Sequence, residues 1–173
     1  MAVRSTKVSA EAIQAGDALS LIVRAGAGYD NIDVSEASRR GIYIANCPGK
    51  NSVAVAELAW GLILACDRRI PDQTADLREG TWNKKEYSNA KGLKGATLGV
   101  IGTGQIGMEI ARRGHAFGMN VVGWSRSLTA EKAASLGIGF CKTLTDLAAQ
   151  SDVVSVSVSA NAETQNLIDE KFV

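Results

Sequence analysis

The stretch from Thr97 to Ser127 shows the clearest pattern of apolar and polar positions in the chain. An apolar run ends at Ile101, a helical spacing of apolar residues follows, and a second apolar run closes at Trp124. Short apolar runs bounded by turn residues are typical of buried strands, and a period near 3.6 residues is typical of a helix. The pattern predicts a strand, a turn, a helix and a second, parallel strand.

The same alternation appears earlier in the chain on a smaller scale. Residues 8–15 and 33–40 have helical character, and short apolar runs at residues 19–24 and 42–45 indicate strands. Strands that alternate with helices are typical of a parallel sheet. This region therefore predicts a small parallel unit of two strands, or of three if residues 1–5 contribute one.

The alternation continues to the end of the sequence. Helices are predicted at residues 129–136 and 144–150, strands at 137–140 and 152–158, and a new helix within 161–173. Together with the two strands described first, this gives a second unit of four strands. A full doubly wound sheet has about six strands, so we expect both units to be incomplete.

A long helix is predicted to connect the two units. From residue 51 onward, apolar residues such as Val53, Leu58 and Leu62 cover more than one stripe of the helix surface. A helix that is apolar on several sides is buried on several sides, so we expect it to pack between the units. Pro71 is expected to end or kink it, before a further helical segment and a polar surface crossing.

Three glycines, Gly102, Gly104 and Gly107, follow the strand that ends at Ile101. The first lets the chain turn sharply, the second lets the backbone approach a pyrophosphate without a Cβ, and the third lets the helix pack close to the sheet. Phosphates then lie at the helix N-terminus, where free N–H groups favour an anion. Because a strand precedes the motif and a helix follows it, a dinucleotide site is favoured over a chance glycine-rich turn.

Ser125 and Arg126 follow the second strand of this unit, where an Asp or Glu usually binds the adenosine ribose and repels a 2′-phosphate. Here no carboxylate is present, and a guanidinium is available to pair with a phosphate, which favours tolerance of NADP. The alternative is that Arg126 is a solvated loop cation and that NAD binds through Ser125. The predicted cofactor is therefore NAD or NADP.

The loop after residues 19–24 is a second candidate site. Arg24 ends the predicted strand, and Gly26 and Gly28 follow it. Open parallel sheets bind ligands at the carboxyl ends of their strands, where these residues would offer a cation and bare N–H groups to a carboxylate or phosphate. The alternative is a turn that needs glycine for its backbone angles alone.

The composition argues against several classes of function. The chain has 173 residues, 46% hydrophobic and 21% charged, with a net charge of +1. That charge provides no field to hold nucleic acid or an anionic membrane, and no apolar stretch is long enough to span a bilayer. Without a secretion signal the chain is expected to be cytoplasmic. Three scattered cysteines argue against a disulfide framework and against a metal site.

Several segments, taken together and in order, resemble the D-isomer-specific 2-hydroxyacid dehydrogenases. They are VRSTKV at Val3, RAGAGYDNID at Arg24, NCPGKNSVAVAE at Asn46, GTW at Gly80, GTGQIG at Gly102 and SDVVSVSV at Ser151. Their combination is far more specific than the glycine motif alone, and it extends over nearly the whole chain.

The resemblance implies an α/β fold of two doubly wound, Rossmann-like units joined by a long helix, with the reaction in the cleft between them. Residues 1–50 would belong to the substrate domain, 51–91 to the interdomain helix and crossing, and 92–173 to the first part of the nucleotide domain. The implied reaction is hydride transfer between a nicotinamide cofactor and a small D-2-hydroxy acid or 2-oxo acid. We expect a phosphorylated substrate because two arginines would face it.

The resemblance also implies roles for individual residues. Those implied to bind the substrate are Arg4, Arg24, Gly26, Gly28 and Asn51. Those implied to bind the cofactor, in addition to Gly102, Gly104 and Gly107, are Val55 near the nicotinamide, Gln105 and Ile106 at the pyrophosphate, Ser125 and Arg126 at the ribose, and Val158 beside the adenine.

No catalytic residue is assigned within this sequence. Members of the family carry a catalytic Arg, Glu and His in a part of the nucleotide domain that would follow Val173. The sole histidine, His115, falls away from the buried face of its predicted helix and is expected on the surface. Hydride transfer needs a base and a cation that polarises the forming carbonyl, so we expect this chain alone to be inactive.

Two other functions stay open. One is a non-catalytic dinucleotide-binding sensor or scaffold of the same fold, and the other is an inactive truncated fragment whose exposed sheet edges and apolar helix favour association. The partners implied by the resemblance are the small acid and further copies of the chain in a homo-oligomer, with neither nucleic acid nor a membrane. A continuation carrying the Arg, Glu and His would support the enzyme.

Overall fold

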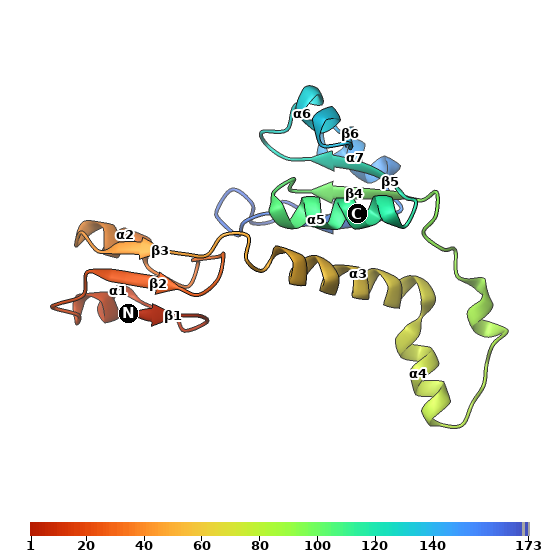
Figure 1. The fold of residues 1–173 in the computed structure, drawn as a ribbon, viewed down its shortest axis with the longest axis horizontal. Coiled ribbons are helices and arrows are strands. Elements are labelled where there is room, and N and C mark those ends of the chain that lie inside the picture. The colour runs from red at the N-terminus through yellow and green to blue at the C-terminus, as the bar shows by residue number, and fades with distance from the viewer. Residues whose placement is uncertain (171, 173) are drawn as a thin grey trace. The chain divides into compact units, whose positions relative to one another are not determined.

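The computed structural model describes residues 1–170 and 172. The chain forms two compact units, and Figure 1 labels most of their helices and strands. The first unit consists of Met1–Asn51 and Ser159–Leu167, and the second of Ser52–Val158 and the described part of Ile168–Val173. Each unit contains its own parallel sheet, which confirms the predicted α/β class.

The first unit contains a three-stranded parallel sheet in the order β1-β2-β3. The strands are β1 (Ala2–Val3), β2 (Leu21–Arg24) and β3 (Tyr43–Ala45). The register places Val3 beside Arg24 on the neighbouring strand. The third strand that residues 1–5 could contribute is therefore present as β1.

Two short helices complete the first unit, and a polar side chain caps each of them. Ser9 accepts a hydrogen bond from the N–H of Ala12 at the start of α1 (Ala10–Gln14), and Asp33 accepts one from the N–H of Glu36 at the start of α2 (Val34–Arg39). Such caps satisfy N–H groups that have no partner within the helix. The helices and strands enclose a small core of Val8, Ile13, Ile22, Ile32, Ala37 and Ile42.

The second unit contains a four-stranded parallel sheet in the order β6-β5-β4-β7. Its strands are β4 (Thr97–Ile101), β5 (Asn120–Trp124), β6 (Gly139–Phe140) and β7 (Val153–Val156). The helices between them are α5 (Gln105–Ala116), α6 (Ala130–Ser135) and α7 (Leu144–Gln150). The strands and helices predicted between residues 97 and 158 are confirmed, with shorter bounds at several ends.

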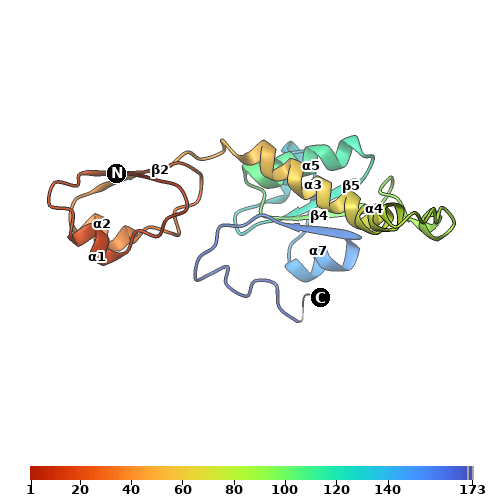
Figure 2. The ribbon, with the colours of Figure 1, turned by 90° about the horizontal axis from the view of Figure 1, so that it is seen from below.

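The strand order reverses direction at β4. The chain moves outward from β4 through β5 to β6 and then crosses to β7 on the other side of β4. Right-handed crossovers then place the connecting helices on opposite faces of the sheet, and Figure 2 shows α5 on one face and α7 on the other. Open α/β sheets bind their ligands at such a reversal, beyond the carboxyl ends of the strands.

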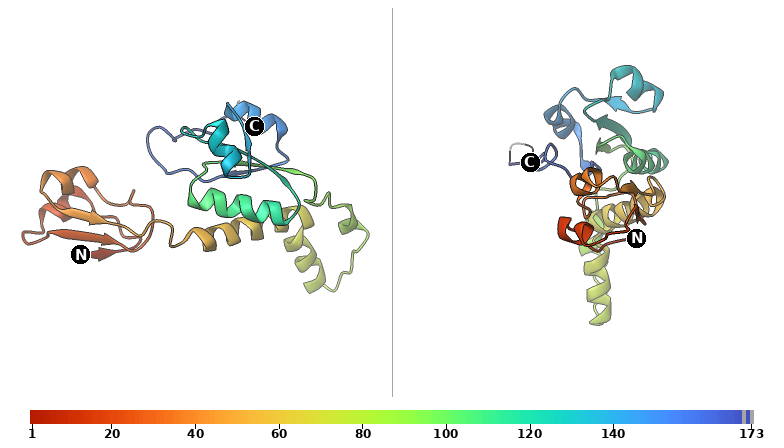
Figure 3. Two further views of the ribbon diagram at one scale, coloured as in Figure 1. Left: turned by 45° about the horizontal axis from the view of Figure 1, so that its top comes forward. Right: turned by 90° about the vertical axis from the view of Figure 1, so that its left-hand side faces the viewer.

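Helix α3 (Ser52–Arg68) packs along α5 within the second unit, as Figures 2 and 3 show. Ala56 and Trp60 are buried against α5, and the indole ring of Trp60 stacks on Phe117 with a centroid separation of 4.6 Å. The indole Nε1 donates a hydrogen bond to the carbonyl oxygen of Ile110 over 3.1 Å. The contact between α3 and α5 therefore belongs to the core of this unit.

The expectation that this helix is buried on several sides is wrong within the described chain. Leu58 and Leu62 are 65% and 59% exposed, and Val53 is exposed as well. Only the stripe that carries Ala56 and Trp60 packs against the unit. The apolar residues on the other faces of the helix could be identified from the sequence. Whether another part of the protein covers those faces could not.

Helix α4 (Ile70–Arg78) follows α3 after a break at Arg69, whose φ of 51° is left-handed. Pro71 lies in the first turn of α4, where its missing N–H costs no helical hydrogen bond. The proline therefore marks the start of a new helix, and α3 ends before it. A 3-10 helix, η1 (Glu86–Asn89), follows in the polar crossing toward β4.

The predicted helix after β7 is wrong over the described residues, 161–170 and 172, which form turns and bends and contain no helix. The side-chain oxygen of Asn161 accepts hydrogen bonds from the N–H groups of Glu163 and Thr164. Such local bonds offer the backbone an alternative to a helix. Lys171 and Val173 lie outside the described residues.

No described helix has the length and apolar character that a bilayer crossing requires. Among the residues that the structure describes, no group of three or more His, Cys, Asp or Glu side chains is placed to hold a metal ion. Cys47, Cys66 and Cys141 are free thiols.

Candidate functional site

Gly102 turns the chain off the end of β4. Its φ is +94°, a conformation that L side chains rarely adopt, and its N–H donates a hydrogen bond to the carbonyl oxygen of Trp124 over 2.8 Å. A Cβ at this position would lie 2.4 Å from the carbonyl oxygen of Ser157, just beyond β7. Both the backbone conformation and the close approach of β7 therefore require glycine, which confirms the predicted sharp turn.

Gly107 lets α5 approach the end of β4. It is buried in the first turn of the helix, and a Cβ there would lie only 2.0 Å from the carbonyl oxygen of Gly102. Backbone atoms cannot retreat as a flexible side chain can. The predicted role of Gly107 in close packing of helix and sheet is therefore confirmed.

Gly104 differs from the other two glycines because no feature of the described residues requires it. Its φ of −78° is an ordinary value, and a Cβ built there would have no atom of the described residues within 4 Å other than those of its two chain neighbours. The residue is exposed at the start of α5, on the side where the strand order reverses. A missing side chain beside open space is what close approach of a pyrophosphate to the backbone would need.

Among the described residues, no side chain caps the N-terminus of α5. Gly104 occupies the cap position, and the first turn contains no acidic residue, whereas Ser9, Asp33, Thr129 and Thr143 cap four other helices. Uncapped N–H groups and the positive end of the helix dipole favour an anion at this place. Gln105 is exposed in this first turn, and Ile106 packs partly against the core.

Charged side chains on α5 pair with one another farther along the helix. The carboxylate of Glu109 accepts a hydrogen bond from Nη1 of Arg113 over 2.6 Å and another from Arg112. These bonds, the one from Arg113 first, hold the pKa of Glu109 below its usual range. The negative charge of Glu109 is thus compensated locally.

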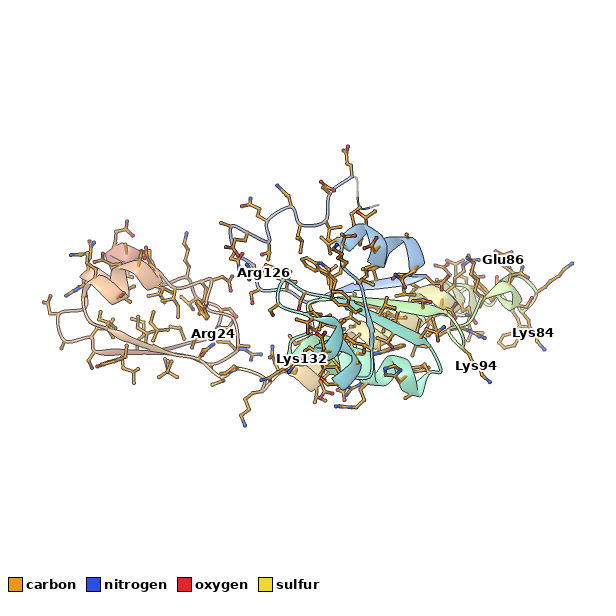
Figure 4. All side chains as sticks on the ribbon, turned by 90° about the horizontal axis from the view of Figure 1, so that it is seen from above. Arg24, Lys84, Glu86, Lys94, Arg126 and Lys132 are labelled. Carbon is orange, nitrogen blue, oxygen red and sulfur yellow. The ribbon has the colours of Figure 1, made fainter. Side chains whose placement is uncertain are left out.

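The residues predicted to bind the ribose follow β5 directly. The hydroxyl oxygens of Ser125 and Thr103 are 3.0 Å apart and form a hydrogen bond. Arg126 comes next, exposed on the loop that leaves β5 (Figure 4). Val158 is half-buried beyond β7, with Cγ1 3.0 Å from the position of a Cβ on Gly102. The structure thus places the glycine turn at the carboxyl end of β4, Ser125 and Arg126 at that of β5, and Val158 at that of β7. These three strands are adjacent in the sheet.

Thr103 is a residue that sequence reasoning missed. It occupies the variable position between the first two glycines of the motif, and its hydroxyl faces Ser125 across two strand ends. The available signal was a hydroxyl residue at this position followed by a serine at the end of the next strand. That signal becomes meaningful only once β4 and β5 are known to be paired in register.

Val55 and His115 lie on helices of the second unit. Val55 is near the start of α3 and 36% exposed, and its role beside a nicotinamide stays a prediction. His115 is exposed in the last turn of α5, at the opposite end of the helix from the glycine turn. The expectation that His115 lies on the surface is confirmed.

In the first unit, the side chain of Arg24 folds over Gly26 (Arg24 is labelled in Figure 4). A Cβ on Gly26 would lie 1.5 Å from Nη1 of Arg24, so the guanidinium occupies the space that a side chain would fill. The Nε atom of Arg24 is buried and has no hydrogen-bond partner among the described residues. Glycine at position 26 therefore makes room for the cation.

Two details of the predicted anion loop need correction. Gly26 does not offer a bare N–H, because that group donates to the carbonyl oxygen of Arg24 over 2.8 Å. The alternative explanation, glycines needed only for their backbone angles, is also wrong, because neither Gly26 nor Gly28 has a left-handed φ. What Gly26 provides is space beside Arg24.

The remaining substrate candidates lie at ends of elements in this unit. Arg4 is exposed and follows β1, and the N–H of Ala25 donates to the carbonyl oxygen of Val3 over 2.8 Å. Arg4 and Arg24 therefore lie at the carboxyl ends of two neighbouring strands. Asn51 is exposed just before α3, and its role stays a prediction.

Comparisons with known proteins agree with this geometry. The sequence model of the family "D-isomer specific 2-hydroxyacid dehydrogenase, NAD binding domain" matches residues 60–173. A D-3-phosphoglycerate dehydrogenase of Methanocaldococcus jannaschii is 40% identical over 169 residues, which cover 97% of this chain and 32% of the relative. A hydroxypyruvate reductase of Thermotoga maritima is 42% identical over 174 residues, covering all of this chain and 55% of the relative.

Solved structures give the same result. A D-lactate dehydrogenase from Aquifex aeolicus, complexed with NAD and lactic acid, matches with a TM-score of 0.89 and 30% identity over 99% of this chain and 51% of its own. An acyclic imino acid reductase in complex with NADPH and D-Arg matches with a TM-score of 0.87 and 29% identity, over 99% and 54% of the two chains. This chain thus spans about a third to about half of the length of these relatives. It belongs to the D-isomer-specific 2-hydroxyacid dehydrogenase family, and its residues 60–173 match the NAD-binding domain of that family.

Proposed function

We propose that this chain is the part of a D-2-hydroxyacid dehydrogenase that binds the dinucleotide and one side of the substrate, in the manner of D-3-phosphoglycerate dehydrogenase. The observation that carries the proposal is Gly104. Neither the backbone conformation nor the packing of the described residues requires a glycine there, and no described side chain caps the helix N-terminus beside it. A ligand that needs close contact with the backbone explains it.

Each residue at the strand ends of the second unit has a proposed task toward the cofactor. Backbone N–H groups of Gly104, Gln105 and Ile106 would bind the pyrophosphate, supported by the uncapped start of α5. Ser125 and Arg126 would bind the adenosine ribose, and Arg126 would favour a 2′-phosphate. Val158 would border the adenine, and Val55 the nicotinamide. When bound, the cofactor supplies or accepts the hydride.

The substrate would lie against the first unit. Arg4 and Arg24 lie at the carboxyl ends of neighbouring strands. Two guanidinium groups suit an acid with a second anionic group such as a phosphate. Gly26, Gly28 and Asn51 would line the same place. The D-3-phosphoglycerate dehydrogenases among the relatives support a phosphorylated hydroxy acid.

The chemical step needs groups beyond those proposed for binding. The base that takes the hydroxyl proton and the cation that polarises the carbonyl are assigned to no residue of these 173, since His115 is exposed at the far end of α5. We propose that this segment binds cofactor without turning it over. Residues 1–50 would then serve as part of the substrate domain, 51–91 as the connection, and 92–173 as the first part of the nucleotide domain.

We also propose that the protein functions as a homo-oligomer, with a dimer as the simplest form. Large apolar side chains are exposed along α3, α4 and the loop after α4, and exposed apolar patches of this kind commonly mark interfaces. These side chains are Leu58, Leu62, Ile70, Leu77 and Trp82.

The experiment is a titration of the purified chain with NADPH and NADH, followed by nicotinamide fluorescence, and then addition of hydroxypyruvate phosphate. We expect saturable binding of at least one cofactor and no decrease in absorbance at 340 nm after the acid is added. A chain that binds neither cofactor would contradict the proposed dinucleotide site. Steady oxidation of the cofactor would contradict the proposal that catalytic groups lie elsewhere.

A further inference from the structure

We propose that the hydroxyl of Thr103 is a positioning group that orients Ser125 and thereby strengthens discrimination between NADPH and NADH. This inference rests on the proposed dinucleotide site and assigns it one further residue. The carrying observation is the 3.0 Å hydrogen bond between the hydroxyl oxygens of Thr103 and Ser125.

The two hydroxyls are held by the ends of neighbouring strands. Ile101 on β4 pairs with Trp124 on β5, and the N–H of Gly102 extends this ladder by donating to the carbonyl oxygen of Trp124 over 2.8 Å. Thr103 directly follows Gly102, Ser125 directly follows Trp124, and both residues are half-buried. Their separation is therefore fixed by the sheet.

The methyl group of Thr103 also has a fixed place. A Cβ on the buried Gly123 of β5 would lie 3.1 Å from Cγ2 of Thr103. The glycine leaves room for the methyl group against the strand. Threonine at position 103 is thus restrained at both branches of its side chain, with the methyl beside Gly123 and the hydroxyl at Ser125.

The direction of the hydrogen bond determines what Ser125 can offer a ligand. A hydroxyl has one proton to donate and two lone pairs that accept. If Thr103 donates to Ser125, the proton of Ser125 is free for another acceptor. A 2′-phosphate dianion only accepts, so it selects this arrangement, whereas a ribose 2′-hydroxyl both donates and accepts and is compatible with either direction.

Arg126 adds charge next to this oriented donor. A guanidinium pairs well with phosphate, and the neighbouring Ser125 would contribute a charge-assisted hydrogen bond of defined direction. The pair of hydroxyls would therefore favour the phosphorylated cofactor more than the unphosphorylated one. A purely structural tie between two strand ends would instead change stability and affect both cofactors alike.

The test compares dissociation constants of NADPH and NADH, measured by nicotinamide fluorescence, for four variants. Thr103→Val removes the hydroxyl and keeps the branched shape, and Thr103→Ser keeps the hydroxyl. Ser125→Ala and the double variant Thr103→Val/Ser125→Ala complete a double-mutant cycle. Thermal unfolding of each variant shows whether the fold is retained.

We expect Thr103→Val to weaken NADPH about threefold to tenfold, the size of one hydrogen bond, with a smaller effect on NADH. Thr103→Ser should restore the NADPH preference of the original chain. In the double variant, loss of the Thr103 hydroxyl should add little to the loss caused by Ser125→Ala.

Equal weakening of both cofactors by Thr103→Val, or fully additive effects in the double variant, would overturn the inference and leave the dinucleotide site standing. The inference also falls if Thr103→Val changes the dissociation constant of neither cofactor. If the original chain binds neither cofactor, this inference and the proposed function both fall.

Discussion

A Cβ atom on Gly107 would lie 2.0 Å from the carbonyl oxygen of Gly102, so α5 fits against the end of β4 only because residue 107 lacks a side chain. Gly107→Ala must push the helix away from the sheet. We expect it to lower the free energy of unfolding by about 1–3 kcal/mol, as overpacking does. Urea denaturation followed by circular dichroism measures this.

The matched control is Gly61→Ala on α3, where an added Cβ meets no atom of the described residues within 4 Å beyond its chain neighbours and the backbone of its own helix, and φ is not left-handed. Alanine in a helix is favoured over glycine by about 0.5–1 kcal/mol, so this variant should be more stable than the original chain. Equal effects of the two substitutions would show that the approach of α5 to β4 is not tight.

Trp60→Phe removes the hydrogen bond from the indole Nε1 to the carbonyl oxygen of Ile110, a buried contact of 3.1 Å. We expect a loss of about 1–2 kcal/mol in the free energy of unfolding, from that hydrogen bond and the reduced ring volume. Tyr43→Phe serves as control, because Tyr43 is 77% exposed and lies outside the apolar surface proposed as an interface, and substitutions at exposed positions stay within about 0.5 kcal/mol. Similar losses for both variants would mean that α3 is not anchored through Trp60.

We expect the phenol of Tyr87 to have a higher pKa than an ordinary tyrosine and so to lose its proton at a higher pH. Its hydroxyl donates to the carboxylate of Asp76 over 2.6 Å, which favours the neutral phenol and, as the main cause, raises the pKa of Tyr87 to about 12. The stabilising contribution of this contact is present below about pH 10, the pKa of an unfolded tyrosine, and is lost as the pH rises through the folded value. The tie between η1 and α4 should therefore weaken only in strong alkali.

Absorbance of tyrosinate at 295 nm measures this prediction. Subtracting the titration of Tyr87→Phe from that of the original chain, which has three tyrosines, isolates the one phenol. We expect the difference curve to have a midpoint near pH 12, and Asp76→Asn should move it down. A midpoint near pH 10 in the original chain would rule out the hydrogen bond to Asp76.

Gly26→Ala tests whether Arg24 is positioned for an anion. The added methyl displaces the guanidinium, which is the far end of a flexible side chain, so the stability of the first unit should change little. Affinity for hydroxypyruvate phosphate should fall about tenfold or more, because hydrogen bonds to charged groups are stronger than neutral ones. Titration calorimetry gives the affinity, with Arg24→Met as the reference for full loss. Undiminished binding by Gly26→Ala would remove Arg24 from the proposed substrate site.

The glycine turn could be predicted from the sequence because its determinants are local. The apolar run, the three glycines and the helical spacing all fall within residues 97–127, and the observed strand, turn and helix follow them. The caps at Thr129 and Thr143 are local as well. Features that depend on neighbours a few residues away are those that a single sequence records most directly.

Features that depend on distant neighbours could not be predicted in this way. The hydrogen bond between Thr103 and Ser125 depends on the register of β4 and β5, and the exposure of Leu58 depends on which face of α3 meets α5. The space that Gly26 leaves depends on the rotamer of Arg24. In each case the residue itself could be identified in the sequence, but the residue that it contacts could be identified only from the folded structure.

The most direct test of the dinucleotide assignment is the affinity of Gly104→Ala for NADPH and NADH, measured together with its thermal unfolding. Apart from its two chain neighbours, no described residue has an atom within 4 Å of an alanine Cβ at this position, and φ is −78°, so the unfolding midpoint should match that of the original chain. We expect the affinity for whichever cofactor binds to fall about tenfold or more, as the methyl group keeps the pyrophosphate from at least one backbone N–H. A folded Gly104→Ala variant that binds both cofactors as the original chain does would contradict the assignment of this turn as the pyrophosphate site.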